Sequence, residues 1–313
     1  MSYTQNNVIN LFKPSGPTSF DMVWSVRKIL GVKKAGHIGT LDPMADGVLP
    51  VCLNRSTRII QFLLPLQKTY RATLELGSAT DTQDATGQKI SIRDASLINE
   101  TKIKKVIQMF VGEQYQVPPM YSAKKKNGIP LYKLARNGIT VDRDPVKITI
   151  YSIEFIKKEE NRVLFDVCCS AGTYIRTLSH DIGENLGCCA HMVRLTRTKV
   201  GLFCLGRTLT LEELKSAHEE GSLPKKLFPL EEVLNFLPAI HVKNEYLEPI
   251  SHGVALSKFF LETLPERFEP GQYFRVLGGD DKILAIVEPV INQDKLSELA
   301  PEDIVFKSKR VLC

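Results

Sequence analysis

The segment Gly36–Pro50, GHIGTLDPMADGVLP, gathers within fifteen positions several side chains that could do chemistry. Asp42 and Asp46 could each present a carboxylate to a substrate, and His37 could accept or donate a proton. The same residue types also suit plain structure, because an Asp–Pro pair often begins a helix and an Asp–Gly pair often forms a turn. Taken alone, the segment leaves a catalytic carboxylate and a structural turn both open.

The residue pattern does not predict a metal site. The seven cysteines include two adjacent pairs, Cys168–Cys169 and Cys188–Cys189, and there is no CxxC spacing. Neighbouring residues of a strand point to opposite faces, so an adjacent pair is poorly placed to chelate one metal. Neither Asp42 nor His37 belongs to a two-histidine motif. We therefore expect buried thiols and no metal.

Charge is unevenly divided along the chain. Residues 1–210 hold 29 Lys and Arg against 17 Asp and Glu, whereas residues 211–313 hold 12 against 18. A basic surface favours a polyanionic partner, although solvated surface charge explains the same excess. No run of about 18 apolar residues could span a bilayer, and the first residues lack the pattern of a secretory signal. We expect a cytoplasmic protein with no membrane contact.

The elements that must position these side chains are mixed strands and helices. Apolar spacing predicts a helix over residues 21–31, and alternation predicts a strand over residues 68–77. Two strands are predicted within residues 146–169, followed by a helix from about Tyr174. Because strands and helices follow one another without a regular βαβ repeat, we expect an α+β fold with a mixed, largely antiparallel sheet.

A basic segment over residues 117–144 contains two tyrosines and opens with a proline pair. Cations contact phosphates and aromatic rings stack on bases, so this insertion could grip nucleic acid. An exposed loop with a short helix would have the same composition.

The chain changes character near its end. After Pro229 it consists of short strand-like runs with Gly–Gly and Asp–Asp turns, which predict a small all-β module. We place the boundary near residues 235–239. The predicted domains are therefore residues 1–235, which carry the candidate site, and residues 236–313.

Several long segments, in order along the chain, resemble the motifs of the TruB family of tRNA pseudouridine synthases. They are KPSGPTSFDMV, GHIGTLDPMADGVLPVCLNRSTR, KTYRATLELGSATDTQDATG, VPPMYSAKKKNGIPLYKLAR, CSAGTYIRTLSHDIG and LGCCAHMVRLTRTKVG. The resemblance covers most of residues 8–210. It departs from the family pattern at Asn54, where Gly is expected, and at Arg58, where Lys is frequent. Asn tolerates the left-handed conformation that Gly supplies, so this difference affects a turn.

The resemblance implies a pseudouridine-synthase fold, in which helices flank the sheet, with a small C-terminal module of PUA-like type. It implies isomerisation of uridine 55 in the T arm of tRNA, where the uracil leaves C1′ of the ribose, rotates and rejoins through C5. An isomerisation needs no metal, redox cofactor or nucleotide, so we expect no cofactor. The partner is tRNA, and we expect a monomer that requires no protein partner.

The resemblance also assigns roles to single residues. Asp42 is implied to act at C1′ of a flipped-out nucleotide, either as a nucleophile or as an electrostatic catalyst. Arg176 is implied to pair with that carboxylate, and Tyr70 to stack on the target base. The remaining implied residues hold the nucleotide, line the base pocket or support the catalytic loop: His37, Tyr174, Leu195 and Lys13.

Two other readings of the same fold stay open at this point. One is a guide-RNA-dependent pseudouridine synthase subunit, against which the long basic insertion and the divergent terminal module argue. The other is a non-catalytic RNA-binding or tRNA-folding protein. The presence of Asp42, Tyr70 and Arg176 together argues against binding as its sole role.

Overall fold

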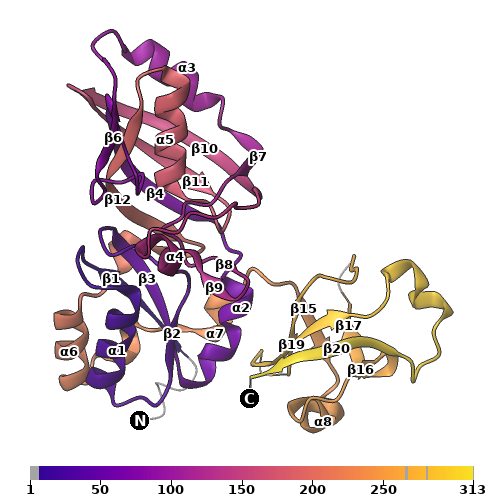
Figure 1. Ribbon diagram of the computed structural model, residues 1–313. Helices are drawn as coiled ribbons and strands as arrows, with labels where there is room; N and C mark the ends of the chain where they lie inside the picture. Colours follow the sequence, from indigo (N-terminus) through magenta and orange to yellow (C-terminus); the bar gives the residue numbers. More distant parts are fainter. Residues whose placement is uncertain (1–6, 265–266, 280, 313) are drawn as a thin grey trace.

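Two sheets organise the protein, whose computed structural model describes residues 7–264, 267–279 and 281–312 (Figure 1). The strands of the first sheet are β1 (Asn7–Lys13), β2 (Ala35–His37), β3 (Asp46–Leu53), β4 (Lys68–Leu76), β7 (Gly112–Gln116), β10 (Val146–Glu159), β11 (Arg162–Cys169), β12 (Ala190–Val200), β13 (Phe203–Cys204) and β14 (Phe228–Pro229). The strands of the second sheet are β15 (Ala239–Val242), β16 (Leu256–Ser257), β17 (Leu261–Thr263), β18 (Phe274–Leu277), β19 (Ile283–Pro289) and β20 (Ile304–Val311).

Two small hairpins and the helices complete the fold. The hairpin strands are β5 (Ser78–Thr80) with β6 (Lys89–Ile92), and β8 (Lys125–Lys126) with β9 (Ile129–Pro130). The α-helices are α1 (Ser19–Leu30), α2 (Ile60–Leu63), α3 (Glu100–Gln108), α4 (Leu131–Arg136), α5 (Ile175–Leu186), α6 (Leu211–Glu219), α7 (Leu230–Val233) and α8 (Leu247–Ser251). The 3-10 helices are η2 (Asn54–Ile59), η3 (Leu205–Arg207), η4 (Leu223–Lys226), η5 (Asn244–Tyr246), η6 (Lys258–Phe260) and η7 (Gln293–Glu298).

Strand β12 joins the two halves of the first sheet, whose main order is β14-β1-β3-β12-β4-β11-β10-β7. Within the described residues, every pairing of this sheet is antiparallel except that of β12 with β3, which is parallel. The expected mixed, largely antiparallel sheet is confirmed. The consequence for function is that β3, β12 and β4, which carry or follow the candidate residues, lie side by side.

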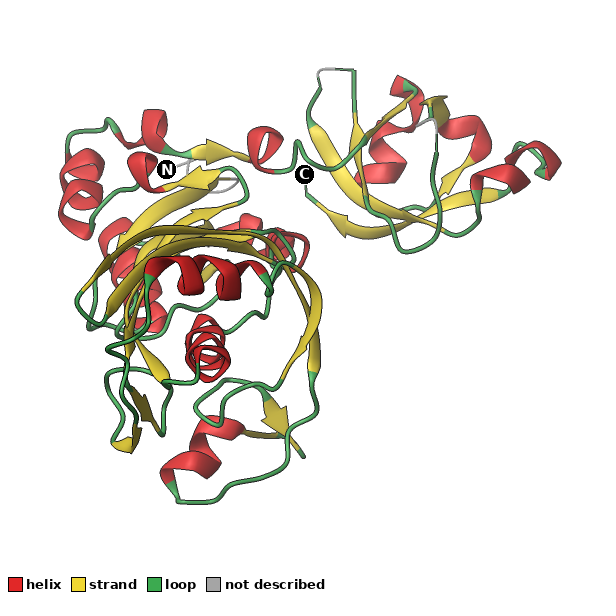
Figure 2. Ribbon diagram, turned by 90° about the horizontal axis from the view of Figure 1, so that it is seen from above, coloured by secondary structure: helices red, strands yellow, loops and turns green. Residues whose placement is uncertain are grey.

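Helices cover the sheet where the sequence predicts apolar faces. Helix α5 packs on β12 and α3 on β10, and Figure 2 shows helices lying in the hollow of the curved sheet. The predicted helix over residues 21–31 is confirmed as α1, with Gly31 in the left-handed conformation after it. Its cap is Thr18, which accepts a hydrogen bond from the Asp21 amide, while the Asp21 carboxylate accepts one from the Thr18 amide. Asp21 therefore closes a capping box with Thr18.

The second sheet packs against the segment that follows β3. Phe62 of α2 lies in one apolar cluster with Leu277, Ile286 and Leu312 of the C-terminal module. The Arg58 guanidinium also donates a hydrogen bond of 3.0 Å to a carbonyl oxygen of β20. These contacts brace the C-terminal module on the larger part of the protein. The boundary predicted at residues 235–236 falls between α7 and β15, and it stays a prediction.

Backbone conformation explains the departure from the family pattern. Asn54 has a φ of 45°, in the left-handed region that Gly or Asn adopts at low cost. The residue starts η2, directly after β3, so the substitution changes a turn and leaves the strand intact. Among the described residues, no helix is both long and apolar enough to cross a membrane.

We predict that Gly183→Ala destabilises the protein. A Cβ at Gly183 of α5 would lie 2.1 Å from the backbone nitrogen of Ala190, at the start of β12. The helix and strand would have to separate, and overpacking of this kind costs about 1–3 kcal/mol, more than the ~1 kcal/mol that Ala gains in a helix. Urea denaturation measures the loss. Gly206→Ala is the matched control because a Cβ there meets no atom within 4 Å, and equal stability of the two variants would contradict this packing.

Candidate active site

A buried guanidinium forms the centre of the candidate site. Arg176 is the second residue of α5, and its side chain is only 5% exposed. Its Nε lies 2.9 Å from Oδ2 of Asp42, whose side chain keeps 37% of its surface exposed. Its Nη1 lies 3.4 Å from Oδ2 of Asp84, which is buried. One cation thus joins a buried carboxylate to a carboxylate that reaches solvent.

Two backbone carbonyl groups fix the same guanidinium further. Nη1 of Arg176 donates to the carbonyl oxygen of Thr82 at 3.2 Å, and Nη2 donates to that of Tyr121 at 2.9 Å. Tyr121 belongs to the basic insertion, whereas Thr82 lies in the turn before β6. The planar guanidinium therefore ties together four segments: the Asp42 turn, the Thr82–Asp84 turn, the insertion and α5.

Asp84 is a site residue that the sequence did not reveal. Oδ1 of Asp84 accepts hydrogen bonds from the Thr82 hydroxyl at 2.8 Å and from the Thr86 amide at 2.9 Å. Asp84 lies in the motif KTYRATLELGSATDTQDATG, in which the resemblance gave a role only to Tyr70. Threonines two positions before and after an aspartate are donors that would hold its carboxylate in place, and this spacing was the available signal.

The Asp42 segment forms a tight turn and not the start of a helix. The Ala45 amide donates to the carbonyl oxygen of Asp42 at 3.1 Å, with Pro43 at the second position of the turn. Pro fixes the φ that this position requires, so the turn is rigid. The helix-cap interpretation of the Asp–Pro pair was wrong, because the chain continues directly into β3.

A buried lysine holds this turn from β1. Nζ of Lys13 donates to the carbonyl oxygens of Ala45 at 2.7 Å, Pro43 at 3.1 Å and Pro14 at 3.0 Å. Burial lowers the pKa of Lys13 to about 8, while the carboxylates of Asp46 and Asp42 oppose that shift. The residue that the family resemblance implied as a loop support therefore lies directly beneath the Asp42 turn.

Asp46, the alternative carboxylate, lies in a different setting. It is the first residue of β3, so the Asp–Gly pair belongs to a strand and does not form the turn first considered. Its Oδ2 lies 3.7 Å from Nη2 of Arg194, which is largely exposed. Asp42 and not Asp46 is the carboxylate that pairs with buried Arg176.

Arg197 is a third buried cation, and the sequence did not single it out. Its Nε donates to the carbonyl oxygen of Val48 at 2.8 Å, and its Nη2 donates to that of Gly39 at 3.0 Å. The side chain also hydrogen bonds with the Tyr70 hydroxyl. Burial raises the pKa of Tyr70, and the positive charge of Arg197 opposes this shift. The hydroxyl therefore stays protonated at neutral pH.

The strands bring the expected pocket residues to one region. Tyr70 of β4 lies opposite Arg197 of β12 in the sheet register, and Leu195, which is buried, lies two residues before Arg197. Tyr174 precedes α5, and its amide donates to Oε1 of Gln116 at 2.8 Å while its carbonyl oxygen accepts from Nε2 at 3.1 Å. Burial raises the pKa of Tyr174, and the negative charge of Asp42 adds to the rise.

His37 lies within the range of the Arg197 charge but is not bonded to Asp42 among the described residues. It is on β2, opposite Val51 of β3, and within the described part of the chain no hydrogen bond or ion pair joins it to Asp42. Its buried Nδ1 has no hydrogen-bond partner. Burial lowers the pKa of His37, and the positive charge of Arg197 adds to this effect, so the neutral imidazole is favoured.

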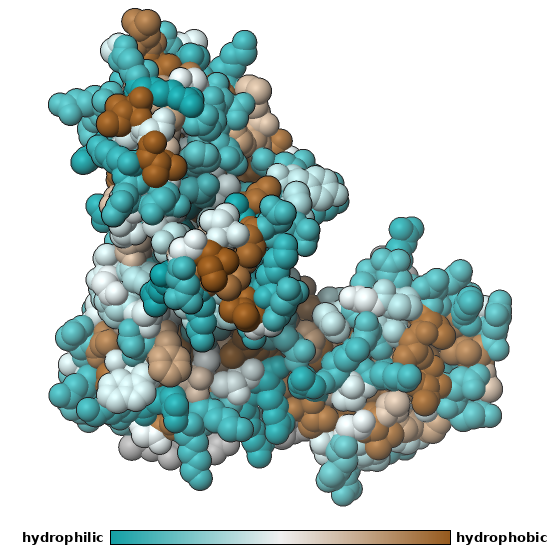
Figure 3. Space-filling view, viewed as in Figure 1, coloured by the Kyte–Doolittle hydropathy of each residue, from teal (hydrophilic) through white to brown (hydrophobic). Residues whose placement is uncertain are grey.

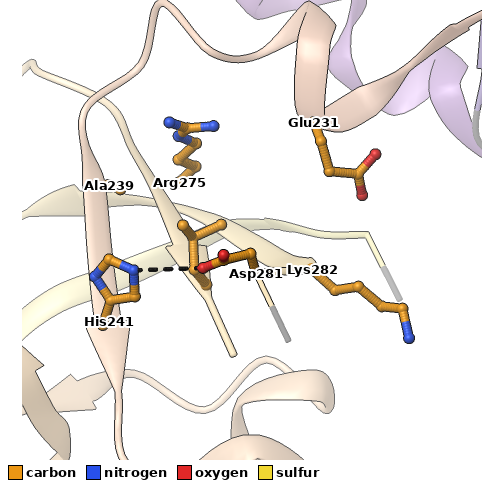
Figure 4. A pocket seen from close by; sticks show the side chains of 7 residues that line it. Glu231, Ala239, His241, Arg275, Asp281 and Lys282 are labelled. Atoms are coloured by element: carbon orange, nitrogen blue, oxygen red, sulfur yellow. Dashed lines mark ion pairs between the residues drawn. The ribbon is translucent and has the colours of Figure 1, made fainter. Parts of the chain in front are cut away.

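Among the described residues, no metal cluster accompanies this arrangement. Within residues 7–264, 267–279 and 281–312, no three His, Cys, Asp or Glu residues are grouped to hold a metal ion. A hollow between α7 and the second sheet is lined by Glu231 and Arg275, and there His241 Nε2 lies 3.8 Å from Asp281 Oδ1 (Figure 4). Acidic and basic groups are mixed there, so we assign it no chemistry.

Family models match most of the chain. One, for the TruB family pseudouridylate synthase (N terminal domain), matches residues 27–175. Another, for the tRNA pseudouridylate synthase B C-terminal domain, matches residues 176–235. The two matched ranges meet between Tyr174 and Arg176, so the candidate site draws on both.

Relatives and solved structures agree with these models. The tRNA pseudouridine synthase B of Clostridium perfringens (strain 13) is 43% identical over 299 residues, covering 95% of this chain and 100% of the relative. That of Staphylococcus saprophyticus is 40% identical over 312 residues, covering 96% and 99%. A solved Cbf5-Nop10-Gar1 complex matches with a TM-score of 0.81 and 32% identity, covering 99% of this chain and 86% of that chain. The expected fold is confirmed.

We predict that Asp84→Asn lowers the free energy of unfolding by about 3 kcal/mol, the usual cost of removing one partner of a buried ion pair. The substitution keeps the side-chain shape but removes one of the two charges that offset Arg176. Urea denaturation measures the loss. The control is Asp81→Asn, an exposed carboxylate in the same turn. A loss within ~0.5 kcal/mol of the control would show that Arg176 does not depend on Asp84.

Proposed function

This chain belongs to the TruB family of pseudouridylate synthases, and we propose that it isomerises uridine 55 in the T arm of tRNA to pseudouridine through Asp42. The observation that carries the proposal is the 2.9 Å contact between Arg176 Nε and Asp42 Oδ2. A partly exposed carboxylate with a buried guanidinium behind it, itself held by three further partners, is suited to act on a bound substrate. The names of the relatives support tRNA as that substrate.

The reaction needs one anion directed at C1′ of the ribose. The N1–C1′ bond breaks, a C5–C1′ bond forms, the C5 proton leaves and N1 gains a proton, so atoms and electrons balance without a co-reactant. Asp42 either attacks C1′ or stabilises the positive charge that develops on the sugar. Both routes require the carboxylate to be ionised and held at a fixed angle.

Asp42 is that anion, and Arg176 and Asp84 together hold it in place. A guanidinium stabilises a neighbouring carboxylate through a charge-assisted hydrogen bond. If Arg176 contacted Asp42 alone, this pair would carry no net charge. Asp84 contacts Arg176 from the buried side and offsets its positive charge. The negative charge of Asp42 therefore faces the substrate, where it stabilises the positive charge that develops on the sugar.

The aromatic and apolar residues form the base pocket in this proposal. The Tyr70 ring stacks on the flipped-out uracil, and its protonated hydroxyl serves proton transfer. Tyr174 and Leu195 close the sides of the pocket, next to α5 and on β12. His37, neutral and outside the ion-pair cluster, contacts the nucleotide and not the carboxylate.

The basic insertion supplies the grip on the RNA. A loop uridine is reached by flipping, and contacts elsewhere must offset the lost stacking. The insertion presents the exposed Lys124 and Lys125, and Tyr121 at its base contacts Arg176 directly. RNA bound on the insertion is therefore linked to the catalytic pair through one carbonyl group. We propose that the chain acts as a monomer and needs no protein partner.

We predict that the purified chain, in the presence of EDTA, releases tritium from uridine labelled at C5 in a T-arm stem-loop transcript. Asp42→Asn should lower the single-turnover rate at least ~10³-fold, because the amide has no charge and is a poor nucleophile. RNA affinity, followed by fluorescence anisotropy, should stay within about threefold. Absence of product with the wild-type chain would refute the function, and comparable turnover of the variant would refute the role of Asp42.

We predict a steep fall of RNA affinity with salt, since phosphate contacts release counterions. The double variant Lys124→Ala/Lys125→Ala should lower the slope of log affinity against log salt by roughly 1–2, about one unit for each phosphate that the variant no longer neutralises. The control is Lys225→Ala/Lys226→Ala, an exposed lysine pair of η4. A flat salt profile, or an equal effect in both variants, would contradict the assignment of the insertion.

A further inference from the structure

Helix α1 presents two aromatic rings to solvent. Phe20 is 72% exposed and Trp24 is 54% exposed, and they lie one turn apart on the outward face of the helix. The inward face of the same helix carries Met22 and Val26, which are buried in the core. Helix α1 is thus anchored in the core without the two rings, and core packing does not explain their presence.

Basic residues accompany these rings on α1 and in the loop that follows it. Nζ of Lys28 lies 5.4 Å from the centroid of the Trp24 ring, one further turn along the helix. Arg27 is exposed beside it, and Lys33 and Lys34 follow in the next loop. The acidic residue of the helix's first turn, Asp21, is already engaged in the capping box. The face therefore combines aromatic rings with positive charge.

The start of α1, where Phe20 lies, is joined to the Asp42 turn. The hydroxyl of Ser19, the residue before Phe20, accepts from the Leu41 amide at 2.9 Å and donates to its carbonyl oxygen at 3.1 Å. Leu41 immediately precedes Asp42. The amide of Gly16 also donates to the carbonyl oxygen of Pro43 at 2.8 Å. The start of α1 is thus fixed on both sides of Asp42.

We propose that Phe20 and Trp24 form a stacking platform for an unpaired nucleotide of the substrate RNA, with Lys28 on the adjacent phosphate. This inference rests on the proposed function. Flipping one nucleotide into the site leaves its neighbours without a stacking partner, and exposed rings next to cations are the usual receptor for such bases. Stacking on a ring tolerates any base, so the platform would contribute affinity and orientation without reading sequence.

Charge favours RNA over a protein as the occupant. A protein-binding patch has an apolar centre depleted of charged residues. Here charged side chains adjoin both rings, and hydrophilic residues cover most of the face on which α1 lies (Figure 3). The two rings are separate apolar points beside the cations of α1, and aromatic rings next to cations are typical of a single-stranded nucleic-acid site.

Trp24 allows a direct test because it is the one tryptophan of the chain. Excitation at tryptophan wavelengths therefore reports on this helix alone. We expect the T-arm stem-loop to quench the tryptophan emission of the full chain. The RNA concentration at half-maximal quenching should equal that at half-maximal binding, measured by the anisotropy of a labelled stem-loop. We expect Phe20→Leu and Trp24→Ser each to weaken binding ~5-fold or more. The rate at saturating RNA should stay within about twofold, because neither ring reaches the reacting atoms.

Tyr151→Leu is the matched control, since it removes a ring that is 46% exposed on β10, a strand remote from α1 in Figure 1. It should bind the stem-loop like the wild-type chain. Unchanged Trp24 emission together with wild-type affinity of both variants would overturn the platform, even if the wild-type chain makes pseudouridine. Emission that responds to a protein from the same cell but not to RNA would overturn it as well. Binding is measured separately from turnover, so failure of the proposed function gives a different pattern, in which RNA binds and no product forms.

Discussion

The structure depends on one buried cation, the guanidinium of Arg176. Removing such a group from water costs several kcal/mol, and only well-placed partners offset that cost. Arg176 has four of them: the carboxylates of Asp42 and Asp84 and the carbonyl oxygens of Thr82 and Tyr121. Together with Arg176 itself, these partners are spread from residue 42 to residue 176, so much of the first sheet and its helices must be folded before the site exists.

Two other buried cations fix the backbone around that pair. Lys13 donates only to carbonyl oxygens beneath the Asp42 turn, and Arg197 donates to carbonyl oxygens on the strand side of the same segment. Because backbone carbonyl groups and the Tyr70 hydroxyl bond these cations, Asp42 and Asp84 remain available to Arg176. The result is a rigid turn. It holds the Asp42 carboxylate where it reaches solvent, whereas Arg176 and Asp84 are buried. The insertion reaches the same centre through Tyr121, which connects RNA binding to the position of the catalytic pair.

Sequence predicted the local features well because local chemistry determines them. Apolar spacing located α1, alternation located β4, and ordered motifs identified Asp42 and Arg176 as partners. Asp84 and Arg197 were missed, because their importance comes from contacts with residues far along the chain. The same limit explains the Asp–Pro pair, which begins a helix in many sequences. Here the turn is fixed instead by a lysine on another strand.

The central claim is that Arg176 acts through its geometry and not through charge alone. Lysine keeps the charge but cannot contact two carboxylates and two carbonyl groups in one plane. The most direct measurement is the single-turnover rate of tritium release by Arg176→Lys, together with its affinity for the T-arm stem-loop. We expect a rate at least ~10²-fold below wild type, with affinity within about threefold. A rate within about threefold of wild type would contradict it.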